Sequence, residues 1–231
     1  MLCGLVAGAL VAGVLGLVFA RMSEDAMSMA TLSLLLIFGV VFDSASKYTG
    51  GAQGVYGIPQ KTTMWLAFGV ALLVIFVGQF FARSKTGLQL RASRSSVVAA
   101  KSLGVRIVRL RWIAWTLAGA LVGLGGALWA GSAIAFTPEE FGLELTFSIL
   151  AALVVGGLFS VTGTVVGVAV LTVAFEVTRR IEESSGLVGL SQIVVSIGIL
   201  VLLYRRPRGL IPAAELPEAL ARLRPRRRVG S

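Results

Sequence analysis

Residues 145–175 read LTFSILAALVVGGLFSVTGTVVGVAVLTVAF, a run of 31 residues without a single charged side chain. One α-helix of that length would extend about 46 Å at a rise of 1.5 Å per residue. The hydrocarbon core of a bilayer is only about 30 Å thick. Glycine and hydroxyl residues gather in the middle of the run, in GGLFSVTGTVVG. We therefore predict a break there, giving two short helices or a re-entrant pair within residues 145–178.

The whole chain has the composition of a membrane protein. It has 231 residues, of which 56% are hydrophobic and 14% charged, and its mean hydropathy is +0.90. Soluble domains carry about 25% charged residues. The apolar runs are continuous, which predicts helices, because helices satisfy their own backbone hydrogen bonds in lipid; a β-barrel would alternate. The predicted fold is an all-α polytopic membrane bundle of about six to seven spans. The other predicted spans are 1–20, 26–42, 62–82, 112–136 and 184–204.

Two basic segments predict the orientation of the chain. Residues 83–111 hold eight Lys or Arg and no acid, and residues 205–231 hold eight Arg and two Glu. Together they contain sixteen of the 21 basic residues, which the positive-inside rule places in the cytoplasm. The Gly-rich loop 43–61 then lies outside. We expect residues 1–212 to form a transmembrane domain with a cytoplasmic loop at 83–111, and residues 213–231 to form a basic cytoplasmic tail. Membrane lipid is an expected partner of these segments, and nucleic acid is not.

Several kinds of chemistry are excluded by the residues present. The chain has one cysteine, Cys3, and no histidine, so it offers no internal disulfide, zinc site or histidine-based catalysis. No phosphate-binding GxxxxGK[ST] motif occurs. We therefore predict no catalytic residue, no metal and no cofactor. If ATP drives the protein, partner subunits must bind it.

A short stretch inside the basic loop, VVAAKSLGV at 97–105, has the pattern of a docking helix. On a helix Val97, Ala100, Leu103 and Gly104 would fall on one face. A face of small residues would allow close approach to a groove on another protein. The alternative is a linker that makes a helical turn on lipid headgroups. The predicted coupling residues are Val97, Val98, Ala99, Ala100, Leu103 and Gly104.

Five segments, in order and covering most of residues 49–212, resemble one known family. They are TGGAQGVYGIP (49–59), the VAAKSLG stretch (98–104), SLGVRIVRLRWIAWTLAGALVGLGGALWA (102–130), LVVGGLFSVTGTVVG (153–167) and RRPRGLIP (205–212). The second is similar to the loop by which ABC importer permeases dock a short cytoplasmic helix into an ATP-binding subunit, with Val98 in place of the usual Glu. Together the segments resemble the permease subunits of branched-chain amino acid ABC transporters, in their LivM-like form.

The resemblance implies a multi-pass permease of a bacterial plasma membrane. Its implied partners are a second permease subunit, two ATP-binding subunits and an extracytoplasmic solute-binding protein. The implied substrates are branched-chain or related small amino acids, with urea or short amides as alternatives. A self-contained secondary transporter or channel is the alternative from another class. Family members carry further spans before the region matched by residue 1, so this chain is expected to lack the family's N-terminal spans.

Two sets of glycines complete the predicted sites. Thr49, Gly50, Gly51 and Gly54 are predicted to line a translocation path if their loop dips into the membrane, because glycine exposes backbone N–H groups; an ordinary turn is the alternative. A second set is predicted to pack helices closely, as small residues do in membranes. It comprises Gly156, Gly157, Gly163 and Gly167. Glu176 is followed by Arg179 and Arg180, which predicts an interfacial ion pair.

Overall fold

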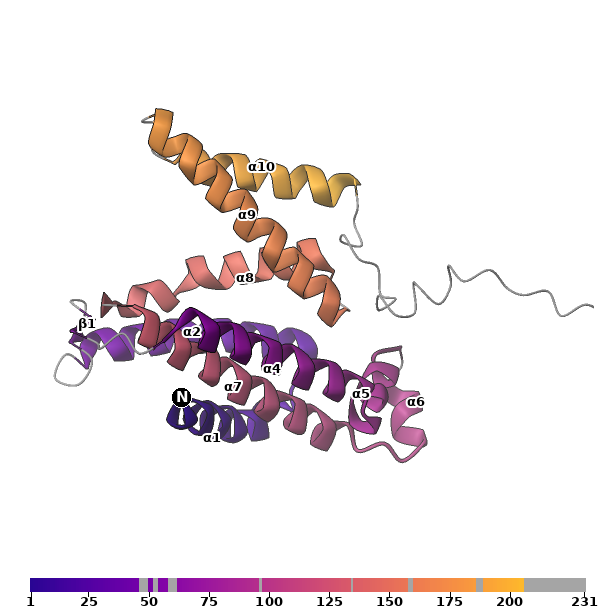
Figure 1. Ribbon diagram of the computed structural model, residues 1–231. Coiled ribbons are helices and arrows are strands. Elements are labelled where there is room, and N and C mark those ends of the chain that lie inside the picture. The colour runs from indigo at the N-terminus through magenta and orange to yellow at the C-terminus, as the bar shows by residue number, and fades with distance from the viewer. Residues whose placement is uncertain are drawn as a thin grey trace, which may run out of the picture. The chain divides into compact units, whose positions relative to one another are not determined.

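The computed structural model describes residues 1–45, 50–51, 54–57, 62–95, 97–133, 135–157, 160–185 and 189–205. The chain divides into two compact units, Met1–Gly142 and Leu143–Ser231 (Figure 1). The first contains α1 (Leu2–Phe19), α2 (Glu24–Ser44), β1 (Val55–Tyr56), α4 (Met64–Arg83), α5 (Lys85–Ser95), α6 (Val97–Ser102), α7 (Ile107–Ser132), β2 (Ala135–Phe136) and the short 3-10 helix η2 (Pro138–Phe141). The second contains α8 (Leu143–Gly156), α9 (Val161–Ser185) and α10 (Leu190–Arg205).

The predicted membrane-helical class is confirmed. Within the described residues, five helical segments are long and apolar enough to cross a membrane, and α10 adds a shorter apolar stretch at Ile193–Leu202. The five are α1, Asp25–Ser44 of α2, α4, α7 and Val161–Glu183 of α9. The helix α7 begins at Ile107 rather than at the predicted residue 112. Arginines in its first turn do not stop the helix, because long basic side chains reach back to the interface while their backbone stays helical.

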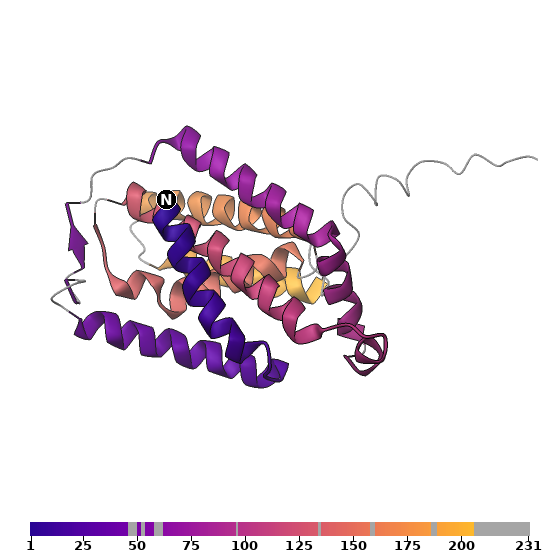
Figure 2. The same ribbon diagram turned by 90° about the horizontal axis from the view of Figure 1, so that it is seen from below.

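In the first unit, α1 lies antiparallel to α7 along a seam of small residues (Figure 2). The small residues recur at every fourth position on both helices, which places them on one face. They are Gly4, Gly8, Ala12 and Gly16 on α1, and Gly119, Gly123 and Ala127 on α7. A Cβ on Gly4 would lie 2.7 Å from the Ala127 Cβ, and one on Gly8 would lie 2.9 Å from the Gly123 Cα. The two backbones are therefore in direct contact, the packing mode that small residues permit in membranes.

Larger side chains close the seam at one end. The Trp112 Nε1–H donates to the Gly13 carbonyl at 2.9 Å, which gives the indole the polar partner it needs when partly buried. The rings of Phe19 and Trp115 meet edge to face, with centroids 5.5 Å apart. These contacts fix the register of α1 on α7.

At the other end of α7, a small ribbon and one threonine tie the unit together. The strands β1 and β2 pair antiparallel, with Val55 opposite Phe136. The Thr62 N–H donates to the Gly131 carbonyl at 3.3 Å, and its hydroxyl donates to the Leu128 carbonyl at 3.3 Å. The start of α4 is therefore held on the last turn of α7.

In the second unit, the break predicted within 145–175 is confirmed, but the second helix is long rather than short, at 25 residues, and runs past residue 178. The helix α8 ends at Gly156, Gly157 takes a φ of +116°, and α9 starts at Val161. Ser160 caps the new helix, because its Oγ accepts from the Gly163 N–H at 3.1 Å. The Thr164 hydroxyl donates to the Ser160 carbonyl at 3.1 Å. The Ser160 hydroxyl thus satisfies a backbone N–H that the start of α9 would leave without a partner.

The core of the second unit joins all three of its helices. Its buried residues are Ala152, Val155, Leu171 and Val195. On the exposed part of α9, Glu176 pairs with Arg179 at 3.3 Å and with Arg180 at 2.9 Å. The predicted ion pair is therefore confirmed, and Glu183 extends it at 2.9 Å from Arg179.

Candidate functional site

The candidate site is the helix pair α5–α6, which connects α4 to α7 (Figure 1). Ser84 makes the turn into it. Its Oγ donates to the Phe81 carbonyl at 2.7 Å and accepts from the Gly87 N–H at 3.2 Å, so one hydroxyl ends α4 and caps α5. A Cβ on Gly87 would lie 3.1 Å from the Ala82 Cα. The loop predicted at 83–111 is therefore a folded helical segment, attached tightly to the membrane helix before it.

The predicted docking residues do not form a single accessible face. Ala100 is only 7% exposed, whereas Leu103 is 83% exposed. Val97 is partly exposed, and the side chains of Val98 and Ala99 lie outside the described residues. Ala100 therefore packs within its own unit, and Leu103 is the one of these side chains most available to a partner.

Gly104 ends helix α6, a role that was not predicted from the sequence. Its φ is +76°, its N–H donates to the Lys101 carbonyl at 2.9 Å, and the Val105 N–H donates to the Ala100 carbonyl at 3.1 Å. This pair of bonds ends α6 in the Schellman motif, for which glycine is strongly favoured. Gly104 thereby turns the chain from α6 towards α7 and leaves Leu103 projecting at the helix end.

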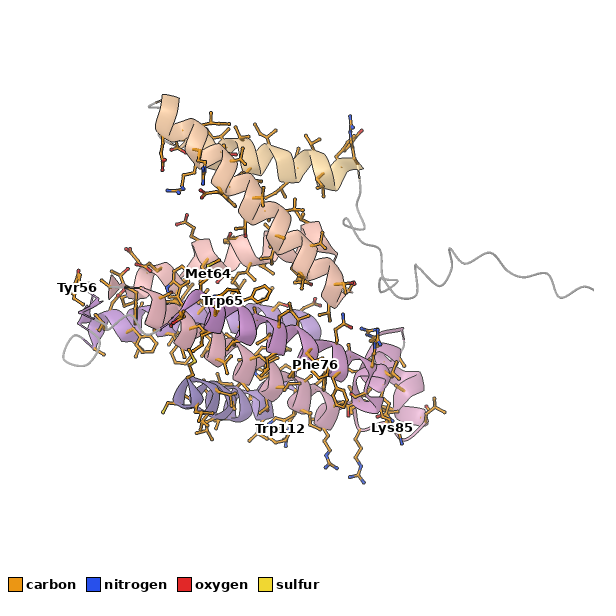
Figure 3. All side chains as sticks on the ribbon, viewed as in Figure 1. Tyr56, Met64, Trp65, Phe76, Lys85 and Trp112 are labelled. Carbon is orange, nitrogen blue, oxygen red and sulfur yellow. The ribbon has the colours of Figure 1, made fainter. Side chains whose placement is uncertain are left out.

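The helix pair and the residues after it expose apolar side chains as well as cations. Leu88 on α5 is 55% exposed. The exposed basic residues of α5 and α6 are Lys85, Arg91 and Lys101. Figure 3 shows Lys85 beside α5, at the opposite end of α4 from Tyr56. Apolar anchors with a basic rim have the chemistry of a protein-docking surface whose partner supplies acidic groups.

The glycines predicted to line a path lie in a tight turn beside the ribbon. Gly50, Gly51 and Gly54 have φ values of +73°, +59° and +76°. The Gly54 N–H donates to the Gly51 carbonyl at 3.0 Å, and a Cβ on Gly54 would lie 3.0 Å from the Phe136 carbonyl carbon. These glycines are thus demanded by backbone conformation and close approach. Thr49 lies outside the described residues, and the role of the set in transport stays a prediction.

The glycines predicted to pack helices lie where α8 meets α9. A Cβ on Gly156 would lie 2.7 Å from the Gly163 carbonyl carbon, and one on Gly167 would lie 2.6 Å from the Gly156 Cα. Gly157 differs, because its φ of +116° makes the bend between the helices. Gly156, Gly163 and Gly167 therefore lie at backbone contacts, and Gly157 lies at the turn.

An apolar cavity of about 460 Å³ was missed by the reading of the sequence. It lies between α2 and the segment formed by β1, β2 and η2, and is lined by Leu35, Phe38, Gly39, Phe42, Val55, Phe136, Pro138 and Phe141. The Phe136 and Phe141 rings meet edge to face at 5.7 Å. In the sequence, the only indication of this cavity is the spacing of Phe38 and Phe42, which places both aromatic rings on one face of a helix. Among the residues that the structure describes, no group of three or more His, Cys, Asp or Glu could hold a metal.

A known protein family matches nearly the whole described part of the chain. Residues 1–204 match the family described as "Branched-chain amino acid transport system / permease component". The high-affinity branched-chain amino acid permease protein LivM of Salmonella typhimurium is 27% identical over 91% of this chain and 56% of its own length. LivM of Escherichia coli K12 is 26% identical over 86% of this chain and 53% of its own length.

A relative with another printed substrate is also similar. The autoinducer 2 import permease LsrC of Enterobacter sp. (strain 638) is 31% identical over 72% of this chain and 50% of its own length. The chain thus spans about half the length of the curated relatives it matches. No solved structure matches it.

Proposed function

Because this chain belongs to the branched-chain amino acid transport system permease family, we propose that it is a membrane-spanning permease subunit of an ABC importer. The observation that carries the proposal is the family match over residues 1–204, which takes in all but the last residue of the described helices. A second permease subunit would complete the pathway. Two ATP-binding subunits would supply the energy, and an extracytoplasmic solute-binding protein would deliver the substrate.

The helix pair α5–α6 supports the ATP-binding partners in this proposal. It presents Leu103, 83% exposed, among cations on the side predicted to be cytoplasmic. Val97, Val98, Ala99, Ala100, Leu103 and Gly104 are the proposed coupling residues. In this proposal Leu103, which is exposed, is the anchor, Ala100 packs inwards, and Gly104 sets the turn.

Branched-chain amino acids are the proposed substrates. The LivM relatives support this, and so does the apolar cavity beside α2, whose aromatic lining suits an aliphatic side chain. Autoinducer 2 is the second candidate, because the LsrC relative is 31% identical to this chain. Thr49, Gly50, Gly51 and Gly54 remain the proposed lining of the path, and Gly156, Gly157, Gly163 and Gly167 the proposed packing residues.

The test is recovery of ATP-binding subunits with the tagged chain from its native membrane. Leu103→Glu should abolish recovery, because it places a charge at the centre of the contact. Tyr56→Glu is the matched control, since Tyr56 is also an exposed apolar side chain, at the other end of α4 (Figure 3). Gly104 is a poor site for such a test, because any other residue would be strained at its φ.

The recovery experiment tests the ATP-binding partner, and an uptake experiment tests the substrate. Recovery with wild type and Tyr56→Glu, but not with Leu103→Glu, supports the docking surface. Absence of an ATP-binding subunit from the wild-type preparation would overturn the importer assignment. Uptake of labelled leucine into proteoliposomes of the recovered complex, with and without competing autoinducer 2, then decides between the two substrates.

A further inference from the structure

Three arginines meet where α1 ends and α7 begins. Arg21 follows α1, and Arg106 and Arg109 belong to the start of α7. With Trp112 they line a cavity of about 380 Å³, completed by Leu17, Ala20 and Val108. Among the described residues, none of the three guanidinium groups pairs with a carboxylate. Unlike Arg179 and Arg180 in the second unit, they are available for an external anion.

An apolar groove continues from this basic cavity. It has a volume of about 450 Å³ and shares Leu17 and Trp112 with the basic cavity. Its remaining lining is Leu5, Val6, Ala9, Leu10, Gly13, Val14 and Thr116. Twelve residues separate Leu5 from Leu17, which gives about 18 Å along α1 at 1.5 Å per residue. That length is close to one leaflet of a hydrocarbon core about 30 Å thick.

The order of the two features matches the depth profile of a membrane. The arginines lie at the end of α7 that continues from the basic helix pair, on the side predicted to be cytoplasmic. Trp112 comes next, labelled in Figure 3, and tryptophan prefers the interface between headgroups and hydrocarbon. The apolar groove then runs into the span. A ligand that fits would need an anionic head, an interfacial region and an aliphatic tail, in that order.

From this arrangement we infer that the α1–α7 pair binds an anionic phospholipid of the cytoplasmic leaflet, such as phosphatidylglycerol. Arg21, Arg106 and Arg109 bind the phosphate, since guanidinium groups can pair bidentately with its oxygens. One acyl chain lies in the groove from Leu17 towards Leu5. A choline headgroup would add a cation beside three arginines, so the site selects against zwitterionic lipid. The bound lipid would connect α1 to the first turn of α7.

The experiment is native mass spectrometry of the full-length protein, as purified from its membrane. The protein is delipidated in detergent and titrated with phosphatidylglycerol or phosphatidylcholine of the same chain length. The wild type should bind phosphatidylglycerol preferentially. The triple variant Arg21→Gln, Arg106→Gln and Arg109→Gln should bind it roughly a hundredfold more weakly, from about 1 kcal/mol for each basic residue.

A matched triple variant controls for overall charge. Lys85→Gln, Arg91→Gln and Lys101→Gln remove the same three charges from α5–α6, outside the cavity, and should leave binding unchanged. Equal loss in the two triple variants would show diffuse attraction and overturn the site. Equal binding of the two lipids by the wild type would overturn it as well.

A second variant tests the groove while every arginine stays in place. Ala9→Trp fills the apolar groove along α1 and should reduce phosphatidylglycerol binding at least tenfold. Unchanged binding would place the acyl chain elsewhere and refute the inference. Excess inorganic phosphate should not displace the lipid, and displacement would show that the cavity recognises phosphate alone. None of these outcomes depends on transport, so the inference and the proposed function can fail separately.

Discussion

Adding one methyl group at Gly123 should weaken the contact between α1 and α7. In Gly123→Ala the new Cβ would lie 2.9 Å from the Gly8 Cα and 3.2 Å from the Gly4 carbonyl carbon. Carbon atoms prefer about 3.5–4.0 Å, so the helices must separate by about 0.6 Å or more. A gap of 0.5–1 Å forfeits about a quarter to a half of the local dispersion attraction. Overpacking of this kind costs about 1–3 kcal/mol.

Gly126→Ala on the same helix is the matched control. A Cβ there would meet no atom within 4 Å, so this variant isolates the gain in helix propensity, up to about 1 kcal/mol. The assay is the melting temperature in detergent, read as the fraction of monodisperse protein after heating. A difference of 2 kcal/mol corresponds to about 4–8 °C for a chain of this size. Equal melting temperatures for the two variants would refute the direct backbone contact between α1 and α7.

Two further predictions concern the break and the ribbon. Ser160→Ala should cost about 0.5–2 kcal/mol by removing the cap of α9. Thermal melting measures the difference, and equal melting of the variant and the wild type would contradict the cap. Gly54→Ala should destabilise more than Gly57→Ala. Both force alanine to a positive φ, near +75°, but only Gly54 also approaches Phe136. Proteolysis rates at the ribbon test this, and similar rates would exclude the close approach.

Much of the helical plan could be predicted from sequence, because uncharged length and charge clusters act locally. The break between α8 and α9 followed from a run too long for one span, and its glycines and hydroxyl residues marked the position. The first turn of α7 was missed, because Arg109 and Arg111 were read as loop. A charge count cannot distinguish a loop from a helix whose arginines point towards the headgroups.

The candidate site was less predictable, because its residues depend on tertiary contacts. Helical spacing placed Ala100 and Leu103 on one face, but the helix ends at Ser102, so Leu103 projects while Ala100 is buried. Gly104 was read as part of a small surface, and its φ identifies it as the helix terminator. The four-residue spacing of Gly119 and Gly123 is typical of close helix packing, but spacing alone cannot identify α1 as the partner, since it describes a face and not its neighbour.

The seam between α1 and α7 has a mechanical consequence. Soft side chains usually absorb small displacements between helices, but at Gly8, Gly119 and Gly123 backbone atoms meet directly without them. The two helices are therefore expected to move together, as one rod. The 26 residues of α7 give this rod a length of about 39 Å. A displacement of the first turn of α7 is therefore expected to reach the Gly131–Thr62 hydrogen bond at the opposite end of the helix.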